Sequence, residues 1–525
     1  MGIYINLDIS HSVTQEEWEK VYEETLVLVN AFPLAERRKV ICKGIETICL
    51  VPTKEREKRY GYNDENVELG WFACGDYDTM CSAEEYALYR NLFNKKKYNP
   101  KAGDAMWGAL PAYLDYTYED KRCSRVYEIW GPKTQGELYH MYLLAIACLI
   151  EARLGTKAFV YGDITRGQCK RAVALANQYL KEAIDVPDRC DMQRFYARVS
   201  KMKLSEKDQL DVFIGLYLGT KDDKFGKFVR DNFSDFACEA YWREKFRNRV
   251  VGTIGFDEKI NEYLLWGFDL GKLCQIVNYV DEKNGPQYEN FVRRIMEAKL
   301  HIKHKNCTDV LQIDQEQSVP YGIPTVFAQF ILAGARNKKV DRYTNIEEIR
   351  SVLLVELGDK CNVEAIIDEC LEQEQLDIED VTEEFAHIIE GKEQQLRKRY
   401  DDYDIIGYEE LLYYEKGLTL YPELQDVLKD FFIFYDSVAD EEHYKALMRK
   451  SYEERAKWLV EQNEYFLLRD KDWQKIFEDI EQNETGFARY YPMARVKITN
   501  EHVMHVIKAL VVNDEFYEYC KNLKE

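Results

Sequence analysis

Three aspartates follow apolar runs of the sequence, a position from which a carboxylate can take part in catalysis. Asp163 comes directly after AFVYG, while Asp76 and Asp78 come after WFACG. Both runs fit the short pattern F-x-x-G-D. If the two strands are neighbours, their carboxylates converge and bind Mg²⁺ through oxygen, and the metal activates a water molecule for hydrolysis. This pattern leads to one hypothesis, a Mg-dependent hydrolase of a phosphoester or nucleotide with carboxylate ligands.

The same aspartates have a second, structural interpretation. Each carboxylate can accept hydrogen bonds from exposed amides in the first turn of a following helix, where the helix dipole also favours negative charge. Aspartates near helix starts are expected without any function, so this interpretation is favoured. The stretch from Gly162 to Gly167 has the glycine spacing of a phosphate-binding loop. However, Gln168 and Cys169 occupy the places of the lysine and of the serine or threonine that phosphate chemistry needs, so no nucleotide cofactor is expected.

A possible zinc site is suggested by HIKHKNC, residues 301–307, where His301, His304 and Cys307 recur at intervals of three. On a helix this spacing places neighbouring side chains on one side, and imidazole and thiolate suit zinc. A structural zinc site needs four ligands, and no fourth residue with metal-like spacing lies nearby. A polar helix end is therefore favoured over a zinc module.

The chain is strongly acidic, with 72 Lys and Arg against 94 Asp and Glu among 525 residues and a formal net charge of −22. A field of that sign repels nucleic acid and attracts a basic protein, although acidity more often serves solubility alone. Trp242, Trp266 and Trp473, and the Tyr-rich runs 408–421 and 515–520, are compatible with an interface. Core packing is the favoured explanation, since aromatic side chains dominate core energetics.

Cysteine usage and hydropathy indicate a reduced, non-membrane environment. The 14 cysteines are scattered and contain no C-x-x-C pair. The amino terminus lacks a basic region followed by an apolar stretch, so no secretory signal is expected. The longest apolar run, residues 141–150, is about half the roughly 20 residues that a membrane helix needs. The composition is typical of a bacterial cytosolic protein without a membrane partner.

Alternating strands and helices are predicted over residues 1–185, in an α/β domain with a mixed sheet. Strands are expected at 3–9, at 38–52 as a hairpin turning at Lys43 and Gly44, and at 70–76, 125–131 and 157–163. The predicted helices start at capping boxes formed by Thr14 with Glu17, Ser82 with Glu85, Thr134 with Glu137, and Thr165 with Gln168. His140 falls in an apolar helix over 138–150, where a neutral core imidazole is expected.

Helical periodicity takes over from about residue 190. Two helix patterns are expected over 258–300, separated at residues 284–286. We predict an α+β, predominantly helical protein, in which the N-terminal domain is followed by an α-helical body. The predicted division is 1–185 as the α/β domain, 186–365 as a helical domain, 366–400 as an acidic helical connector, and 401–525 as a C-terminal helical domain.

Two functional hypotheses follow from these patterns. The leading one is a binding protein that acts by protein–protein recognition, in an immunity, defence or regulatory role, with its acidic surface steering a basic partner. The rival is the Mg-dependent hydrolase, with Asp76, Asp78 and Asp163 as metal ligands. A zinc site at residues 301–307 is compatible with either.

Overall fold

The computed structural model describes residues 2–59, 67–92, 98–111, 113–114, 125–281, 285–301, 340, 342–373, 405–406, 408–420, 422–440, 442–463, 465–482, 486–496, 498 and 501–524. The chain packs into two compact units, each of which joins segments that are far apart in the sequence. Unit 1 comprises Met1–Leu28, Tyr89–Gly136 and His140–Ile388, and unit 2 comprises Val29–Leu88, Glu137–Tyr139 and Ile389–Glu525. The domain boundaries at residues 185, 365 and 400 stay predictions.

Unit 1 is built around a three-stranded antiparallel sheet in the order β7-β1-β8. The strands are β1 (Ile5–Ser10), β7 (Val126–Trp130) and β8 (Ala158–Gly162). The central strand β1 is buried on both faces, since Leu7 and Asp8, which point to opposite sides of the sheet, are both fully buried. The strands predicted in these regions are confirmed.

Helices follow this sheet along unit 1. They are α1 (Gln15–Ala31), whose last turn belongs to unit 2, η1 (Ala105–Ala109), α4 (Tyr139–Leu154), η2 (Gly155–Lys157), α5 (Arg166–Ala176), η3 (Asp188–Cys190), α6 (Met192–Val199), α7 (Glu206–Leu216), α8 (Asp223–Asn232), α9 (Asp235–Arg247), α10 (Ile254–Leu265), α11 (Leu270–Ile276), α12 (Tyr288–Glu297) and α14 (Ile346–Leu357), with the short strands β9 (Val280–Asp281) and β10 (Gly285–Pro286) between α11 and α12. Trp242 and Trp266 are each 1% exposed, and their rings lie 5.3 Å apart in the core of these helices. These tryptophans therefore pack the core, as the favoured interpretation expects.

Unit 2 contains a second sheet, formed by β2 (Leu34–Cys42), β3 (Ile45–Pro52), β4 (Arg56–Arg59), β5 (Val67–Asp76) and β6 (Ser82–Tyr89). The order is β3-β2-β5-β4, and β6 also pairs with β5. The predicted β2–β3 hairpin is confirmed. It turns at Lys43 and Gly44, whose φ angles are 47° and 83°, the left-handed conformation that a tight two-residue hairpin needs.

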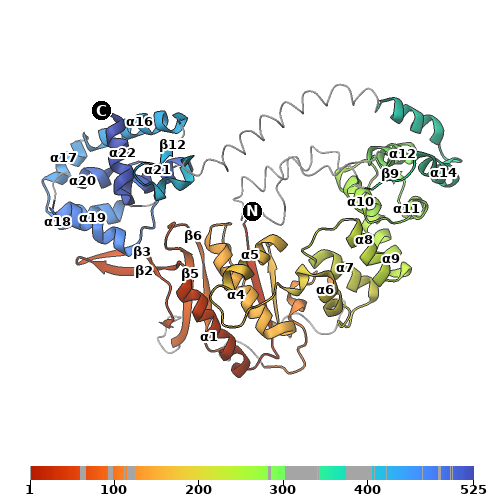
Figure 1. The fold of residues 1–525 in the computed structure, drawn as a ribbon, viewed down its shortest axis with the longest axis horizontal. Helices are drawn as coiled ribbons and strands as arrows, with labels where there is room; N and C mark the ends of the chain where they lie inside the picture. Colours follow the sequence, from red (N-terminus) through yellow and green to blue (C-terminus); the bar gives the residue numbers. More distant parts are fainter. Residues whose placement is uncertain are drawn as a thin grey trace. The chain divides into compact units, whose positions relative to one another are not determined.

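The C-terminal part of unit 2 is helical and packs against the hairpin. Its elements are β11 (Ile405–Ile406), η4 (Tyr408–Tyr413), β12 (Thr419–Leu420), α16 (Pro422–Ser437), η5 (Val438–Asp440), α17 (Glu442–Met448), α18 (Tyr452–Gln462), α19 (Asp470–Gln482), α20 (Gly486–Tyr490), η6 (Tyr491–Ala494), α21 (Glu501–Val512) and α22 (Asp514–Lys524). Figure 1 shows α16 to α22 gathered together in blue. Helices α18 and α19 contact the hairpin, and Cys49 of β3 and Trp473 of α19 belong to one hydrophobic core.

Two predicted helix starts are wrong. Ser82 begins strand β6 instead of a helix, because pairing with β5 outweighs the local capping pattern; the buried residues Tyr86 and Leu88 alternate with exposed or half-buried neighbours. The helix predicted from Thr134 begins only at residue 139. Thr134 does not cap it, since its hydroxyl contacts His140 Nδ1 at 2.7 Å instead.

The α+β class, with strands near the amino terminus and a helical body after them, is confirmed. The pairings of β1 with β7 and β8, and of β2 with β3 and β5, are antiparallel, whereas a mixed sheet was expected. The first helix pattern over 258–300 is divided into α10 and α11, because the chain turns at Gly267 with φ of 73°. No helix within the described ranges is both long and apolar enough to cross a membrane.

Candidate functional site

Asp163 lies at the end of β8 and continues the β1–β8 ladder. Its Oδ2 accepts a hydrogen bond from the Tyr4 N–H at 3.0 Å, and its own N–H donates to the Tyr4 carbonyl at 2.9 Å. The helix that follows, α5, is capped by Thr165 and Gln168 and not by Asp163, so the capping box predicted there is confirmed. Asp163 therefore extends the pairing between β8 and the residue that precedes β1.

Asp76 is the last residue of β5 and Asp78 lies in the turn between β5 and β6, both in unit 2, whereas Asp163 belongs to unit 1. Asp76 is fully buried and accepts a hydrogen bond from the Thr79 N–H at 2.6 Å. Burial raises the pKa of its carboxyl. Asp78 lines a small polar pocket with Arg469, which donates to the Asp78 carbonyl at 3.3 Å. The Asp76 carboxylate thus supplies a hydrogen-bond acceptor for a backbone N–H of the turn.

The candidate zinc ligands are only partly described. His301 follows α12, while His304 and Cys307 lie outside the residues that the structure describes. Across the described part of the chain, no group of three or more His, Cys, Asp or Glu side chains is placed to hold a metal ion. The metal hypotheses at the aspartates and at residues 301–307 stay predictions.

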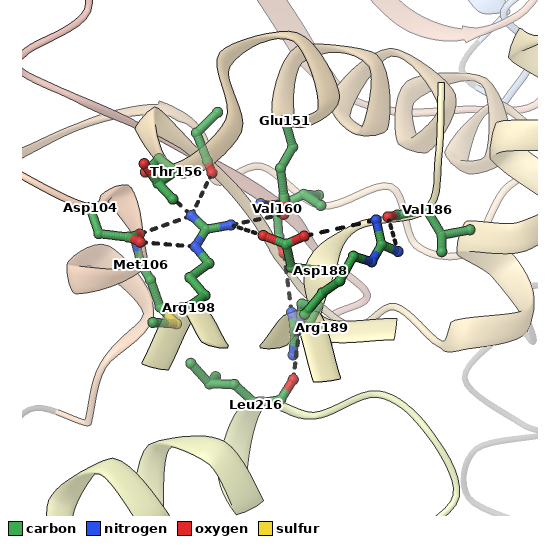
Figure 2. Close-up of polar contacts among 12 residues, drawn as sticks. Asp104, Met106, Glu151, Thr156, Val160, Val186, Asp188, Arg189, Arg198 and Leu216 are labelled. Atoms are coloured by element: carbon green, nitrogen blue, oxygen red, sulfur yellow. Dashed lines mark hydrogen bonds and ion pairs between the residues drawn. The ribbon is translucent and has the colours of Figure 1, made fainter. Parts of the chain in front are cut away.

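A cluster of charged side chains surrounds Arg198 of α6 in unit 1 (Figure 2). Asp104 binds its guanidinium through two oxygens, at 2.9 Å from Nε and 2.8 Å from Nη2. Nη1 contacts Glu151 at 3.3 Å and Asp188 at 3.4 Å. The Thr156 and Ala158 carbonyls accept from Nη2 as well. Arg198 is 3% exposed, so three acidic residues, which lie 94, 47 and 10 residues away along the chain, converge on one buried cation.

Glu151 and Arg189 complete this buried network. Glu151 accepts from the Val160 N–H at 2.7 Å, and burial raises the pKa of its carboxyl to about 7 against the opposing effect of Arg198. Arg189 donates to the Leu216 and Val160 carbonyls at 2.7 and 3.1 Å. Every guanidinium nitrogen of Arg198 already donates a hydrogen bond within the protein, so no N–H group remains to bind a substrate. The network ties β8 to α4, η3 and α6, and its chemistry is structural.

A different feature, which the sequence patterns had not singled out, is an exposed face on α16 of unit 2. Leu428, Phe432 and Tyr435 point into the core, yet Ile433 and Phe434 between them are 44% and 50% exposed. The run FFIFY is the signal that could have revealed it, since five consecutive apolar residues cover more than one side of a helix. We refer to Val427, Ile433 and Phe434, with the exposed acidic residues Asp426, Asp430 and Asp436, as the α16 face.

The buried groups and the α16 face differ in what they can do. His140, in α4, is fully buried and its pKa is lowered to about 4 by burial, so it is neutral at physiological pH as the sequence predicts. It is therefore a core imidazole, whereas the α16 face offers apolar and acidic groups to a partner. Comparison with protein-family models, curated proteins and solved structures finds no match for this chain.

Proposed function

We propose that this is a cytoplasmic binding protein that regulates or neutralises another protein by recognising it, and that the α16 face carries the recognition. The supporting observation is the exposure of Val427, Ile433 and Phe434, at 49%, 44% and 50%, on a single helix. Exposed apolar groups that gather on one element, rimmed by polar residues, are typical of interaction sites.

The α16 face also indicates the chemistry of its partner. At 100° per residue, Asp426, Asp430 and Ile433 fall within about 60° of one another around the helix, and Phe434 lies beside them. Apolar side chains are thus interleaved with carboxylates, which outnumber the one exposed cation of this helix, Lys429. A partner with complementary charge presents Lys or Arg around an apolar centre, and its approach is accelerated by the net charge of −22.

The apolar side chains are expected to supply most of the binding free energy. Removing apolar surface from water yields roughly 25 cal/mol per Å², and a few well-packed side chains dominate most interfaces. Ile433 and Phe434 are the expected anchors, since they are adjacent and both protrude. The carboxylates are expected to govern the association rate and its dependence on salt more than the affinity.

The test compares two double variants in affinity capture from a cell extract. In the Ile433→Ser, Phe434→Ser variant, a specific partner should be lost. The control variant carries Phe236→Ser and Ile254→Ser, which remove two still more exposed apolar side chains, 82% and 71% exposed, from unit 1. The partner should be retained by the control.

The captured protein is then purified and titrated against each variant. We expect a loss of affinity of about tenfold or more for the α16 variant, as is usual for anchor residues, and weaker association as salt increases. A partner that binds both variants equally well would contradict the assignment of the α16 face. A partner whose binding is insensitive to salt would contradict the role of the carboxylates.

A further inference from the structure

Unit 2 contains a pocket of about 520 Å³ between the β2–β3 hairpin, the β5–β6 turn and the helices α18, α19 and α21. Its volume lies within the range of roughly 300 to 1,000 Å³ that is common for small-molecule sites. The pocket is separate in sequence from the α16 face, because no residue of α16 lines it. It therefore offers a binding capacity beyond protein recognition.

Two basic side chains line the pocket without an acidic partner. Lys508 of α21 donates to the carbonyls of Thr79 and Met80, at 3.4 and 3.5 Å. Within the described residues, neither Lys508 nor Arg37 of β2 forms an ion pair, and Arg37 makes no hydrogen bond through its guanidinium. In a chain with a net charge of −22, two such cations at one pocket leave a site suited to an anion.

A buried donor and an apolar wall add to this arrangement. Trp473 of α19 lines the pocket and is 1% exposed, and its indole N–H has no acceptor within the described part of the chain. A buried donor of this kind costs free energy unless an acceptor arrives. Ile48, Phe466 and Met504 provide apolar lining. The pocket thus combines the cations of Arg37 and Lys508 with an apolar surface for a hydrocarbon or aromatic body.

The thiol at the pocket is not arranged for covalent chemistry. Burial raises the pKa of Cys81 to about 11, and the Glu137 carboxylate contributes in the same direction while Lys508 opposes it. Cys81 is therefore a neutral thiol at physiological pH, and a thiol is a poor nucleophile compared with a thiolate. Glu137 also reduces the positive charge of the pocket, so a singly charged anion fits it better than a highly charged one.

From these groups we infer that the pocket binds a small amphipathic organic anion, with its acidic group between Arg37 and Lys508 and its apolar body against Ile48, Phe466 and Met504. The inference does not depend on the α16 face.

The test uses the full chain and two fluorescent probes with the same rings. 1-Anilinonaphthalene-8-sulfonate carries a sulfonate, and N-phenyl-1-naphthylamine lacks it. We expect saturable binding of one sulfonate probe per chain, with a loss of affinity of fivefold or more in each of Arg37→Gln and Lys508→Gln. The neutral probe should bind these variants and the wild type with the same affinity.

Matched variants distinguish binding at this pocket from a general effect of lost charge or lost apolar surface. Lys445→Gln removes an exposed cation of α17, 52% exposed at the side chain, and should leave sulfonate binding unchanged. The Ile433→Ser, Phe434→Ser variant should also bind the sulfonate normally. Arg37 lies on the exposed side of the hairpin, so its variant keeps the test valid if Lys508→Gln impairs folding. Absence of a saturable site, or equal affinity of Arg37→Gln and wild type, would overturn the inference.

Discussion

Tyr4 and Asp163 are joined by a reciprocal pair of hydrogen bonds, in which each backbone N–H donates to an oxygen of the other residue, at 3.0 and 2.9 Å. The last residue of β8, just before Asp163, is Gly162, with φ of 107°, and a Cβ atom there would lie 2.7 Å from the Tyr4 carbonyl oxygen. The chain thus approaches β1 so closely that only glycine fits. The carboxylate of Asp163 extends a strand pairing beyond the last residue of the strand.

Substituting this turn should loosen the edge of the sheet in unit 1. Asp163→Ala removes one partly solvated hydrogen bond and should cost about 1 kcal/mol, whereas Gly162→Ala should cost more, about 1–3 kcal/mol, because it adds backbone strain. Hydrogen exchange of peptides from β1 and β8, followed by mass spectrometry, measures both effects. Asp231→Ala, at an exposed position of α8, is the control.

The same Asp163→Ala variant also tests the hydrolase hypothesis. Titration of Mg²⁺ and Mn²⁺ by calorimetry should give identical results for the variant and the wild type if Asp163 only holds the sheet edge. Metal binding by the wild type that disappears in Asp163→Ala, with hydrogen exchange otherwise unchanged, would support a metal-dependent enzyme instead.

Removing the cation at the centre of the buried network should severely destabilise unit 1. Arg198→Met leaves the half-buried Asp104 carboxylate without its bidentate partner and removes the cation that favours ionisation of Glu151, for which the expected cost is about 3–5 kcal/mol. Arg194→Met, in the same helix, removes an exposed pair with Asp185 at 3.0 Å and a weaker one with Asp188 at 3.9 Å, and should cost about 1 kcal/mol or less. Chemical denaturation followed by hydrogen exchange of α6 compares them. A similar effect of the two substitutions would be evidence against the central role of Arg198.

Glu151 should make the stability of unit 1 fall as the pH rises. Its pKa is about 7 in the folded protein, raised by burial from an ordinary value of 4.5. Between these two values the folded state binds more protons than the unfolded state, so the unfolding free energy decreases with increasing pH. Comparing wild type with Glu151→Gln from pH 4.5 to 7 isolates this slope. Parallel pH profiles for the two proteins would show that Glu151 is ionised throughout.

His140 should act in the opposite direction over an overlapping pH range. Burial lowers its pKa to about 4 from 6.5, so the unfolded state takes up the proton first as the pH falls below 6.5. Stability is therefore lost between pH 6.5 and about 4. The melting temperature of wild type, compared with His140→Gln at pH 7 and pH 5, measures this loss. Because Glu151 and His140 oppose each other, the variants must be examined separately. An equal decrease in both proteins would exclude His140 as the cause.

Local sequence determined the features whose partners lie close along the chain. The turn at Lys43 and Gly44 needs only backbone conformations, and Thr165 reaches the amide of Gln168 three residues later. Such contacts form with little loss of chain entropy, so the types and spacing of the residues are sufficient to predict them. The capping pattern of Ser82 and Glu85 predicts a helix that does not form, because this segment pairs with β5 as strand β6.

Only the tertiary structure decided which distant residues share a site. Arg198 binds Asp104, which is 94 residues away, and the pocket brings Arg37 together with Lys508. No local sequence pattern identifies these contacts, because an arginine or lysine looks the same in a sequence whether its side chain is buried, paired or free. Whether such a side chain is buried, paired or free depends on the groups that folding brings near it from other segments. The hydrogen bond from Tyr4 to the Asp163 carboxylate is another contact of this kind, since the two residues are far apart in the sequence.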